Sequence, residues 1–178
     1  LVDACKGCYA TTGMYNMPNV KAPRISNKED WKRKEWVDDM VSAIFNDELF
    51  RWFDSGDAYD LRLTKKIKQV IERTPTTKHW FPTRQHKFPK FAKVLAEIAA
   101  LPNAVVRLSS DSINGGIIAG DTTSTIWNTK PPKGAFECGA YTREGQCKDC
   151  RACWDKNVKV VAYPGHGNKM LKVIRLQE

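Results

Sequence analysis

The sequence predicts an α/β fold, a partial TIM-like (β/α) barrel with parallel strands. Three expected strands begin near residues 49, 79 and 104, a period of 25–30 residues. Helical patterns over 60–73 and 88–101 connect them, and this alternation is typical of parallel sheets with right-handed crossovers. A complete eight-unit barrel needs about 250 residues, whereas this chain has 178. We therefore expect a partial barrel, with an open α/β sheet as the alternative, in one domain over residues 1–178.

The other elements follow from hydrophobic periodicity and from turn residues. Residues 1–26 contain Gly13, Pro18 and Pro23 and are expected to form a loop. Apolar steps of three and four residues predict a helix over 28–48 with Asn27 as its N-cap. The expected strands are 49–53, 79–83, 104–108, 123–127 and 158–162, and a short closing segment covers 170–176.

Composition describes an ordinary globular chain with a basic surface. Hydrophobic residues make up 42% and charged residues 28%, and no apolar run is long enough to span a membrane. The N-terminus lacks the basic and apolar regions of a signal peptide, so we expect a reducing cytoplasm. The net charge of +9 favours an anionic partner, including nucleic acid; solubility alone is the simpler explanation.

Four of the six cysteines lie close together near the C-terminus. Cys147, Cys150 and Cys153 follow the spacing C-x2-C-x2-C, and Cys138 precedes them. The same spacing opens the iron–sulfur motif of bacterial ferredoxins, whereas zinc ribbons use two separated C-x2-C pairs. The spacing predicts a thiolate metal site holding an iron–sulfur cluster, with zinc, disulfides or free thiols as alternatives. Cys5 and Cys8 form a second, weaker C-x2-C motif.

Polar residues follow the expected strands, and in parallel folds these strand ends meet on one face. We expect catalytic roles for Asp54, Asp57, Arg84 and Asp111, and cofactor-binding roles for Ser55, Gly56 and Ser110. Each also has a structural explanation, because Asp and Ser form turns and cap helices. If the N-terminal loop covers this face, all six cysteines would surround one cavity with these residues.

Four segments together resemble a known bacteriophage family, the gene product eighty-eight-like proteins. The segments are Cys5–Ala10, Phe50–Asp57, Pro82–Arg84 and Cys150–Asp155, so the resemblance covers most of the chain. That family is similar to radical-SAM enzymes and iron–sulfur proteins with a TIM-like barrel. The resemblance implies a protein that works in the cytoplasm of a phage-infected host cell.

Radical-SAM proteins hold a 4Fe–4S cluster with three cysteines spaced C-x3-C-x2-C. Cys5 and Cys8 match the last two of these, but Leu1 stands where the first would be. Ser55, Gly56 and Asp57 occupy a place similar to the family's Gly-Gly-Glu-like motif, which binds the amino group of S-adenosylmethionine. Three thiolates leave one iron open for that cofactor, whereas four close the cluster, which then transfers electrons or stabilises the fold.

Three functional hypotheses follow. The first is a 4Fe–4S protein with redox or radical-SAM-like chemistry on an unknown small-molecule or macromolecular substrate. The second is a zinc-stabilised nucleic-acid-binding module, in which Arg143, Lys148 and Arg151 near the cysteines contact phosphates. The third makes the metal purely structural, because metal binding adds to the free energy of folding.

Overall fold

The structure is a computed structural model that describes residues 2–176. It divides into two compact units, each described here by itself. The split unit combines Leu1–Tyr15 with Arg107–Glu178, and the central unit is Asn16–Val106. The expectation of one domain over 1–178 stays a prediction. Leu1, where the radical-SAM pattern has its first cysteine, lies outside the described residues.

The described strands form a six-stranded sheet in the order β1-β2-β3-β4-β6-β5. The pairs β1–β2, β3–β4, β4–β6 and β5–β6 are parallel. The expected fold class, an α/β fold with the parallel strands of a partial TIM-like barrel, is confirmed, although β5 and β6 exchange places relative to their chain order. The strands are β1 (Leu49–Arg51), β2 (Lys78–Thr83), β3 (Ala104–Ser109), β4 (Thr123–Trp127), β5 (Phe136–Glu137) and β6 (Val160–Pro164).

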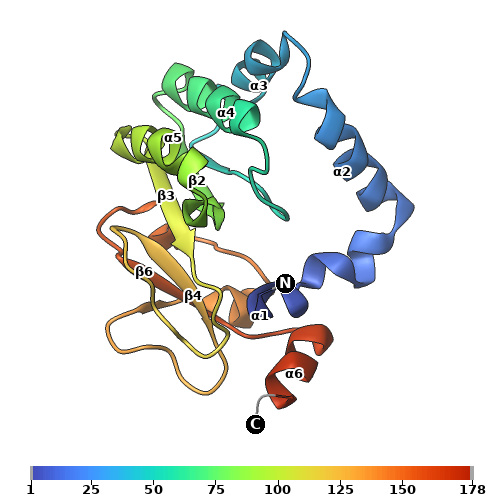
Figure 1. Ribbon diagram of the computed structural model, residues 1–178, viewed down its shortest axis with the longest axis vertical. Coiled ribbons are helices and arrows are strands. Elements are labelled where there is room, and N and C mark those ends of the chain that lie inside the picture. Colours follow the sequence, from blue (N-terminus) through green and yellow to red (C-terminus); the bar gives the residue numbers. More distant parts are fainter. Residues whose placement is uncertain (1, 177–178) are drawn as a thin grey trace. The chain divides into compact units, whose positions relative to one another are not determined.

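Helices of the central unit pack through the apolar faces that the sequence predicts. In Figure 1, α4 lies between α3 and α5, and these helices contact one another in that order. Helix α4 buries Leu63, Ile67, Val70 and Ile71, which recur at three- and four-residue steps. The helices of this unit are α2 (Pro18–Asp30), α3 (Trp36–Ile44), α4 (Leu61–Arg73) and α5 (Pro89–Ala100), with the 3-10 turn η3 (Gln85–Lys87).

The region expected to be a loop followed by one helix over 28–48 differs from that prediction. Helix α2 already begins at Pro18, because proline is well suited to the first position of a helix, where its missing N–H is not needed. The chain then breaks over residues 31–35, and α3 begins at Trp36. Trp31, the first residue of the break, is buried.

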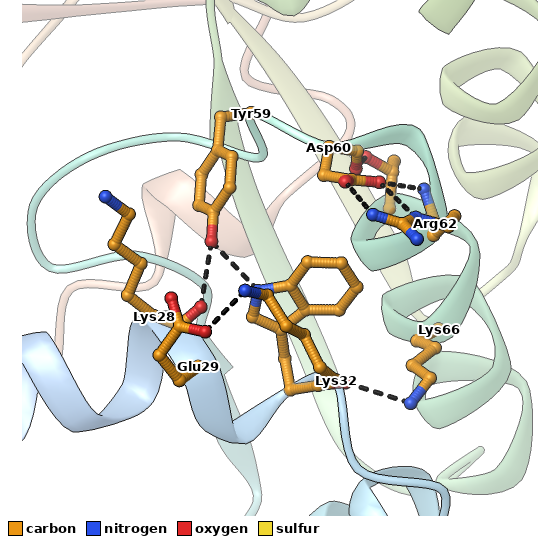
Figure 2. A network of polar contacts seen from close by, with 9 residues as sticks. Lys28, Glu29, Lys32, Tyr59, Asp60, Arg62 and Lys66 are labelled. Carbon is orange, nitrogen blue, oxygen red and sulfur yellow. Dashed lines mark hydrogen bonds and ion pairs between the residues drawn. The ribbon is translucent and has the colours of Figure 1, made fainter.

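A polar network fixes this break within the central unit (Figure 2). The hydroxyl of Tyr59 accepts from Trp31 Nε1 at 2.9 Å and donates to the carbonyl oxygen of Lys28 at 3.1 Å. Lys66 Nζ donates to the carbonyl oxygens of Trp31 and Arg33, which the helix end leaves without intrahelical partners.

Asp60 caps helix α4 in the same region. Its Oδ1 accepts from the Arg62 amide at 2.7 Å, and the Arg62 guanidinium pairs with Oδ2 at 2.8 Å. The hydrogen bond from Arg62 lowers the pKa of Asp60 to about 2. The predicted start of this helix is therefore confirmed, together with a physical cause.

The split unit joins the two ends of the chain. Helices α1 (Asp3–Lys6) and α6 (Asn168–Arg175) pack together, as Figure 1 shows. Ala4, Ile113, Met170 and Ile174 form their shared apolar core. The expected closing segment is thus a helix whose partner is the N-terminus, and strand β6 begins two residues later than predicted. Short 3-10 turns complete this unit: η1 (Tyr9–Thr11), η2 (Gly13–Asn16, which ends one residue into the central unit), η4 (Gly139–Arg143) and η5 (Ala152–Trp154).

Gly7 is required by close packing. Its φ is −85°, which any residue adopts, so the backbone turn does not itself need glycine. A Cβ atom at this position would lie 2.6 Å from Met170 Sδ and 2.9 Å from Met170 Cα. Glycine therefore allows the segment between Cys5 and Cys8 to approach helix α6. Among the described residues, no helix is long and apolar enough to cross a membrane.

Candidate metal centre

The cysteine loop, defined as residues 138–153, begins directly after strand β5. The amide of Cys138 donates to the carbonyl oxygen of Ala162 at 2.9 Å, which attaches the start of the loop to strand β6. The amide of Cys150 donates to the carbonyl oxygen of Cys147 at 2.9 Å, and Cys153 lies in the turn η5. A tight backbone turn therefore separates Cys147 from Cys150.

The thiols of this loop affect one another's ionisation. Burial raises the pKa of Cys138, and the neighbouring Cys147 and Cys150 raise it further. Burial also raises the pKa of Cys153 to about 11, with added effects from Cys138 and Cys147. Cys138 and Cys153 are thus protonated at neutral pH, and a cation that binds them must displace their protons.

The donor set fits a soft metal or an iron–sulfur cluster, because thiolates are the ligands that both prefer. Within residues 2–176, no group of three or more His, Cys, Asp or Glu side chains converges to hold a metal ion. Cys147 is exposed and Cys153 is buried, so the loop has to tighten around any shared ligand. The assignment of Cys138, Cys147, Cys150 and Cys153 as metal ligands therefore stays a prediction.

A buried arginine holds the end of the cysteine loop in place. Arg107 comes from strand β3 and is 0% exposed. Its Nη2 donates to the carbonyl oxygens of Ala152 at 3.1 Å and Asp155 at 3.2 Å, on both sides of Cys153. Its Nη1 donates to the carbonyl oxygens of Thr123 at 3.1 Å and Val158 at 3.0 Å.

Four backbone carbonyls thus accept hydrogen bonds from the two Nη atoms of a charge that is costly to bury, while its buried Nε has no partner among the described residues. Burial lowers the pKa of Arg107 from its usual value, while Tyr163, Cys153 and Asp155 act in the opposite direction. A guanidinium has five donors in a fixed fork. Arg107 can therefore bond at the same time to strand β4, to the cysteine loop and to the segment that precedes strand β6. This geometry fixes the backbone on both sides of Cys153.

Tyr163 lies against the sulfur of Cys153. The Tyr163 hydroxyl oxygen and Cys153 Sγ are 3.2 Å apart in a hydrogen bond. Burial and the nearby Cys153 raise the pKa of Tyr163 well above its usual value, so the phenol keeps its proton. It can therefore donate to a Cys153 thiolate, and such hydrogen bonds to ligating sulfurs tune metal sites.

The N-terminal cysteines belong to the same unit as the loop. Cys5 lies in α1 and Cys8 precedes η1, with the Cys8 amide donating to the Cys5 carbonyl oxygen at 3.2 Å. The side chain of Lys169 in α6 donates to Thr11 Oγ1 at 2.6 Å, which ties down the segment that follows Cys8.

Three stacked rings, which we call the aromatic bridge, connect this segment to the cysteine loop. The bridge consists of Tyr9, His166 and Tyr141. The His166 ring stacks on Tyr141 at 4.7 Å and on Tyr9 at 6.3 Å between centroids. Tyr9 directly follows Cys8, and Tyr141 lies three residues after Cys138. The bridge therefore brings both cysteine segments to His166, at the end of strand β6.

The polar residues at the ends of β1 and β2 lie in the central unit. Asp57 Oδ1 accepts from Thr83 Oγ1 and from the Ala58 amide, each at 2.8 Å, and Oδ2 accepts from the Arg84 amide at 2.7 Å. Asp57 thus joins the segments after both strands. Asp54 pairs with Arg51 at 3.8 Å. These hydrogen bonds support a structural role for Asp57 in holding the two segments together. The catalytic roles of Asp54, Asp57 and Arg84 stay predictions.

Ser55 and Gly56 lie between these two acids, also in the central unit, and Gly56 has a φ of +91° that favours glycine. Ser110 and Asp111 belong to the split unit, after β3. Ser110 Oγ accepts from the Ser112 amide at 3.2 Å, and the carbonyl oxygen of Asp111 accepts from the Ala4 amide at 3.3 Å. Asp111 therefore lies beside the N-terminal cysteine segment.

Arg107 and Tyr163 did not emerge as site residues from the sequence. One signal was available for Arg107, because a charged residue interrupts the apolar strand Ala-Val-Val-Arg-Leu. Such a residue is buried only with partners. Tyr163 offered no such signal, because its contact with Cys153 depends on the path of the loop.

Comparison with known proteins identifies a family for this chain. The family model described as Gene product 88 matches residues 3–156. The match includes all six cysteines and confirms the resemblance to this phage family. No curated protein and no solved structure matches the chain. The chain therefore belongs to the Gene product 88 family.

Proposed function

We propose that the chain is an iron–sulfur protein in which Cys138, Cys147, Cys150 and Cys153 hold a 4Fe–4S cluster. The observation that carries the proposal is the presence of these four cysteines in one loop of sixteen residues. The spacing C-x2-C-x2-C favours an iron–sulfur cluster over zinc. A thiolate site of this kind suits a reducing compartment, so the proposal places the protein in the cytoplasm of the infected host cell.

Residues around the loop have defined roles in this proposal. Such a cluster, when bound, supplies one-electron chemistry. Arg107 fixes the backbone on both sides of Cys153 through four hydrogen bonds. The Tyr163 hydroxyl shares a hydrogen bond with the Cys153 sulfur and would donate to it once Cys153 is a thiolate. These contacts would orient Cys153 as a ligand and adjust how strongly its sulfur donates electrons to the cluster.

A radical-SAM-like reaction is the finer form of this proposal. Cys5 and Cys8 are joined to the loop through the aromatic bridge. In this form only three of the six thiolates would hold the cluster, Cys5 and Cys8 among the candidates, and the iron left open would bind S-adenosylmethionine. Asp54, Asp57, Arg84 and Asp111 would act on a substrate that is not identified. Ser55, Gly56 and Ser110 would contact the cofactor.

Anaerobic purification tests the proposal. We expect a brown protein with about four iron and four sulfide per chain, as a 4Fe–4S cluster requires, and an EPR signal after reduction. Cys150→Ser should lose the iron. A change in the EPR signal on adding S-adenosylmethionine would support an open iron, and an unchanged signal would support a purely electron-transferring or structural cluster. A colourless protein without iron would exclude the proposal.

A zinc-stabilised nucleic-acid-binding module is the second candidate. It rests on the net charge of +9 and on the exposed Lys148 and Arg151 within the cysteine loop. It predicts one zinc ion per chain and an affinity for DNA or RNA that falls as salt rises. Stoichiometric zinc with salt-sensitive binding would favour it over the iron–sulfur proposal, whereas iron with sulfide would exclude it.

A further inference from the structure

A pocket of about 440 Å³ opens in the split unit where strand β4 ends. Its volume lies within the range of small-molecule sites. Asn128 through Lys133 form one wall, Asn114 and Gly115 another, and Ile174 of helix α6 contributes an apolar contact. No cysteine lines it, so its chemistry is separate from that of the cysteine loop.

The charge of this pocket is entirely positive. Lys130 and Lys133 line it, and no aspartate or glutamate does. Neither lysine forms an ion pair or hydrogen bond within residues 2–176. Two uncompensated cations match a phosphate ester, which carries close to two negative charges at neutral pH.

The walls of the pocket are held rigidly. Asn128 Nδ2 donates to Asn114 Oδ1 at 2.8 Å, which ties one wall to the other. Gly115 has a φ of +79°, and a Cβ atom there would lie 3.1 Å from Pro132 Cγ, so glycine permits the close approach of the two walls. Pro131 and Pro132 fix the backbone between the two lysines. Little ordering of the backbone is then needed on binding.

Polar and apolar groups accompany the cations. Asn114, Asn128 and Thr129 supply amide and hydroxyl groups, and Pro131 and Ile174 supply apolar surface. Amides and hydroxyls hydrogen-bond to the hydroxyl groups of a ligand. The lining thus suits an ester that carries hydroxyls better than a bare inorganic anion.

The position of the pocket supports a ligand-binding role. It lies beyond the C-terminal end of β4, and the Gly165 amide at the end of β6 donates to the Trp127 carbonyl oxygen at 2.7 Å on the same side. In parallel α/β folds, ligands bind outside the carboxyl ends of the strands. Two observations therefore agree, the location and the uncompensated charge.

We propose that this pocket binds a small hydroxyl-bearing phosphate ester, with Lys130 and Lys133 holding the phosphate. The proposal does not depend on the metal centre, because none of the residues that carry it is a predicted metal ligand. It assigns a binding site that the iron–sulfur proposal does not include. It also gives a chemical class for a ligand or substrate of the protein.

Isothermal titration calorimetry at low ionic strength tests this with ribose 5-phosphate as the probe. We expect saturable binding, and at least tenfold weaker binding in the double variant Lys130→Ala/Lys133→Ala. Ribose should bind at least tenfold more weakly than its phosphate, because it lacks the charged group. Inorganic phosphate should also bind more weakly, because it cannot use the asparagines fully.

Lys159→Ala is the matched control, since Lys159 is an exposed lysine that precedes strand β6, at the opposite ends of the strands. It should bind the probe like the wild type. Thermal unfolding checks that the double variant is folded, and Lys133→Ala alone serves if it is not. Absence of saturable binding, equal binding of ribose, or equal weakening in Lys159→Ala would overturn the proposal. Inorganic phosphate binding as tightly as the ester would overturn the choice of ester.

Discussion

The Tyr163 hydroxyl lies 3.2 Å from Cys153 Sγ, in a hydrogen bond that links strand β6 to the last cysteine of the loop. Tyr163 follows Cys153 by ten positions in the chain, and the contact forms between the turn η5 and strand β6. This contact places Cys153 in a protein environment, whereas Cys147 faces solvent. The four cysteines of the loop are therefore not equivalent, and the first prediction follows from this difference.

Tyr163→Phe should weaken metal retention and leave the fold intact. The substitution removes only the hydroxyl, so a Cys153 thiolate would lose its hydrogen-bond donor. Loss of such a contact lowers metal affinity by about 10- to 100-fold. Competition with a chelator measures this, and Tyr141→Phe is the control, because its hydroxyl makes no hydrogen bond within residues 2–176. Equal metal loss in both variants would show that the Tyr163 hydroxyl has no special role.

Arg107→Ala should destabilise the split unit strongly. Four carbonyl oxygens would lose their donor, and each buried group left unsatisfied costs about 1–3 kcal/mol. We expect a loss on the order of 3 kcal/mol or more in urea unfolding. Arg175→Ala, at an exposed position in α6, should change stability by no more than about 0.5 kcal/mol. Arg107→Lys should recover part of the loss, because an ammonium offers fewer donors in a different geometry.

His166→Ala should release the N-terminal cysteines from the loop. The side chain stacks on Tyr9 and Tyr141, so its removal breaks the aromatic bridge. Cys5 and Cys8 should then react several-fold faster with iodoacetamide in the metal-free protein, as mass spectrometry can follow. Cys153 should keep its slow rate.

His166→Phe is the matched control for that experiment, because it keeps an aromatic ring between the two tyrosines. It should retain slow alkylation of Cys5 and Cys8. If both variants behave like the wild type, the bridge does not hold the N-terminal segment.

His79 should make the stability of the central unit depend on pH. The ring is 0% exposed, accepts from Trp52 Nε1 at 3.2 Å and contacts Thr74 Oγ1 at 2.9 Å. Burial lowers the pKa of His79 from 6.5 to about 4. Below pH 6.5, His79 of the unfolded chain binds a proton, whereas His79 of the folded protein stays neutral until the pH falls to about 4. Stability is therefore complete above pH 6.5 and falls by about 3 kcal/mol as the pH drops to 4.

Urea unfolding between pH 4 and 8 measures this effect. His79→Gln cannot titrate, so it should be less stable at pH 7 but show a smaller loss between pH 6.5 and 4. A wild-type stability that stays flat over this range would contradict the assignment.

Local pattern predicted much of the fold. Helices α4 and α5 and strands β2, β3 and β4 lie within one or two residues of their expected bounds, because their apolar periodicity is strong and Thr74-Pro75 or Pro102-Asn103 end the helices. Helix α2 was missed because it buries no residue, so its sequence carries no apolar stripe to detect. Strand β5 was missed because its two residues are too few to show alternation.

The sequence by itself determined the fold class and predicted the chemistry. Cysteine spacing indicates a thiolate site, and strand–helix alternation indicates a parallel sheet, because both depend on neighbours in the chain. Only the tertiary structure decided which distant groups meet. Burial of Arg107 beneath the loop, the contact of Tyr163 with Cys153, and the stacking of His166 between two cysteine segments join residues far apart in sequence. Such contacts depend on how loops pack on the sheet, and residue spacing does not encode that.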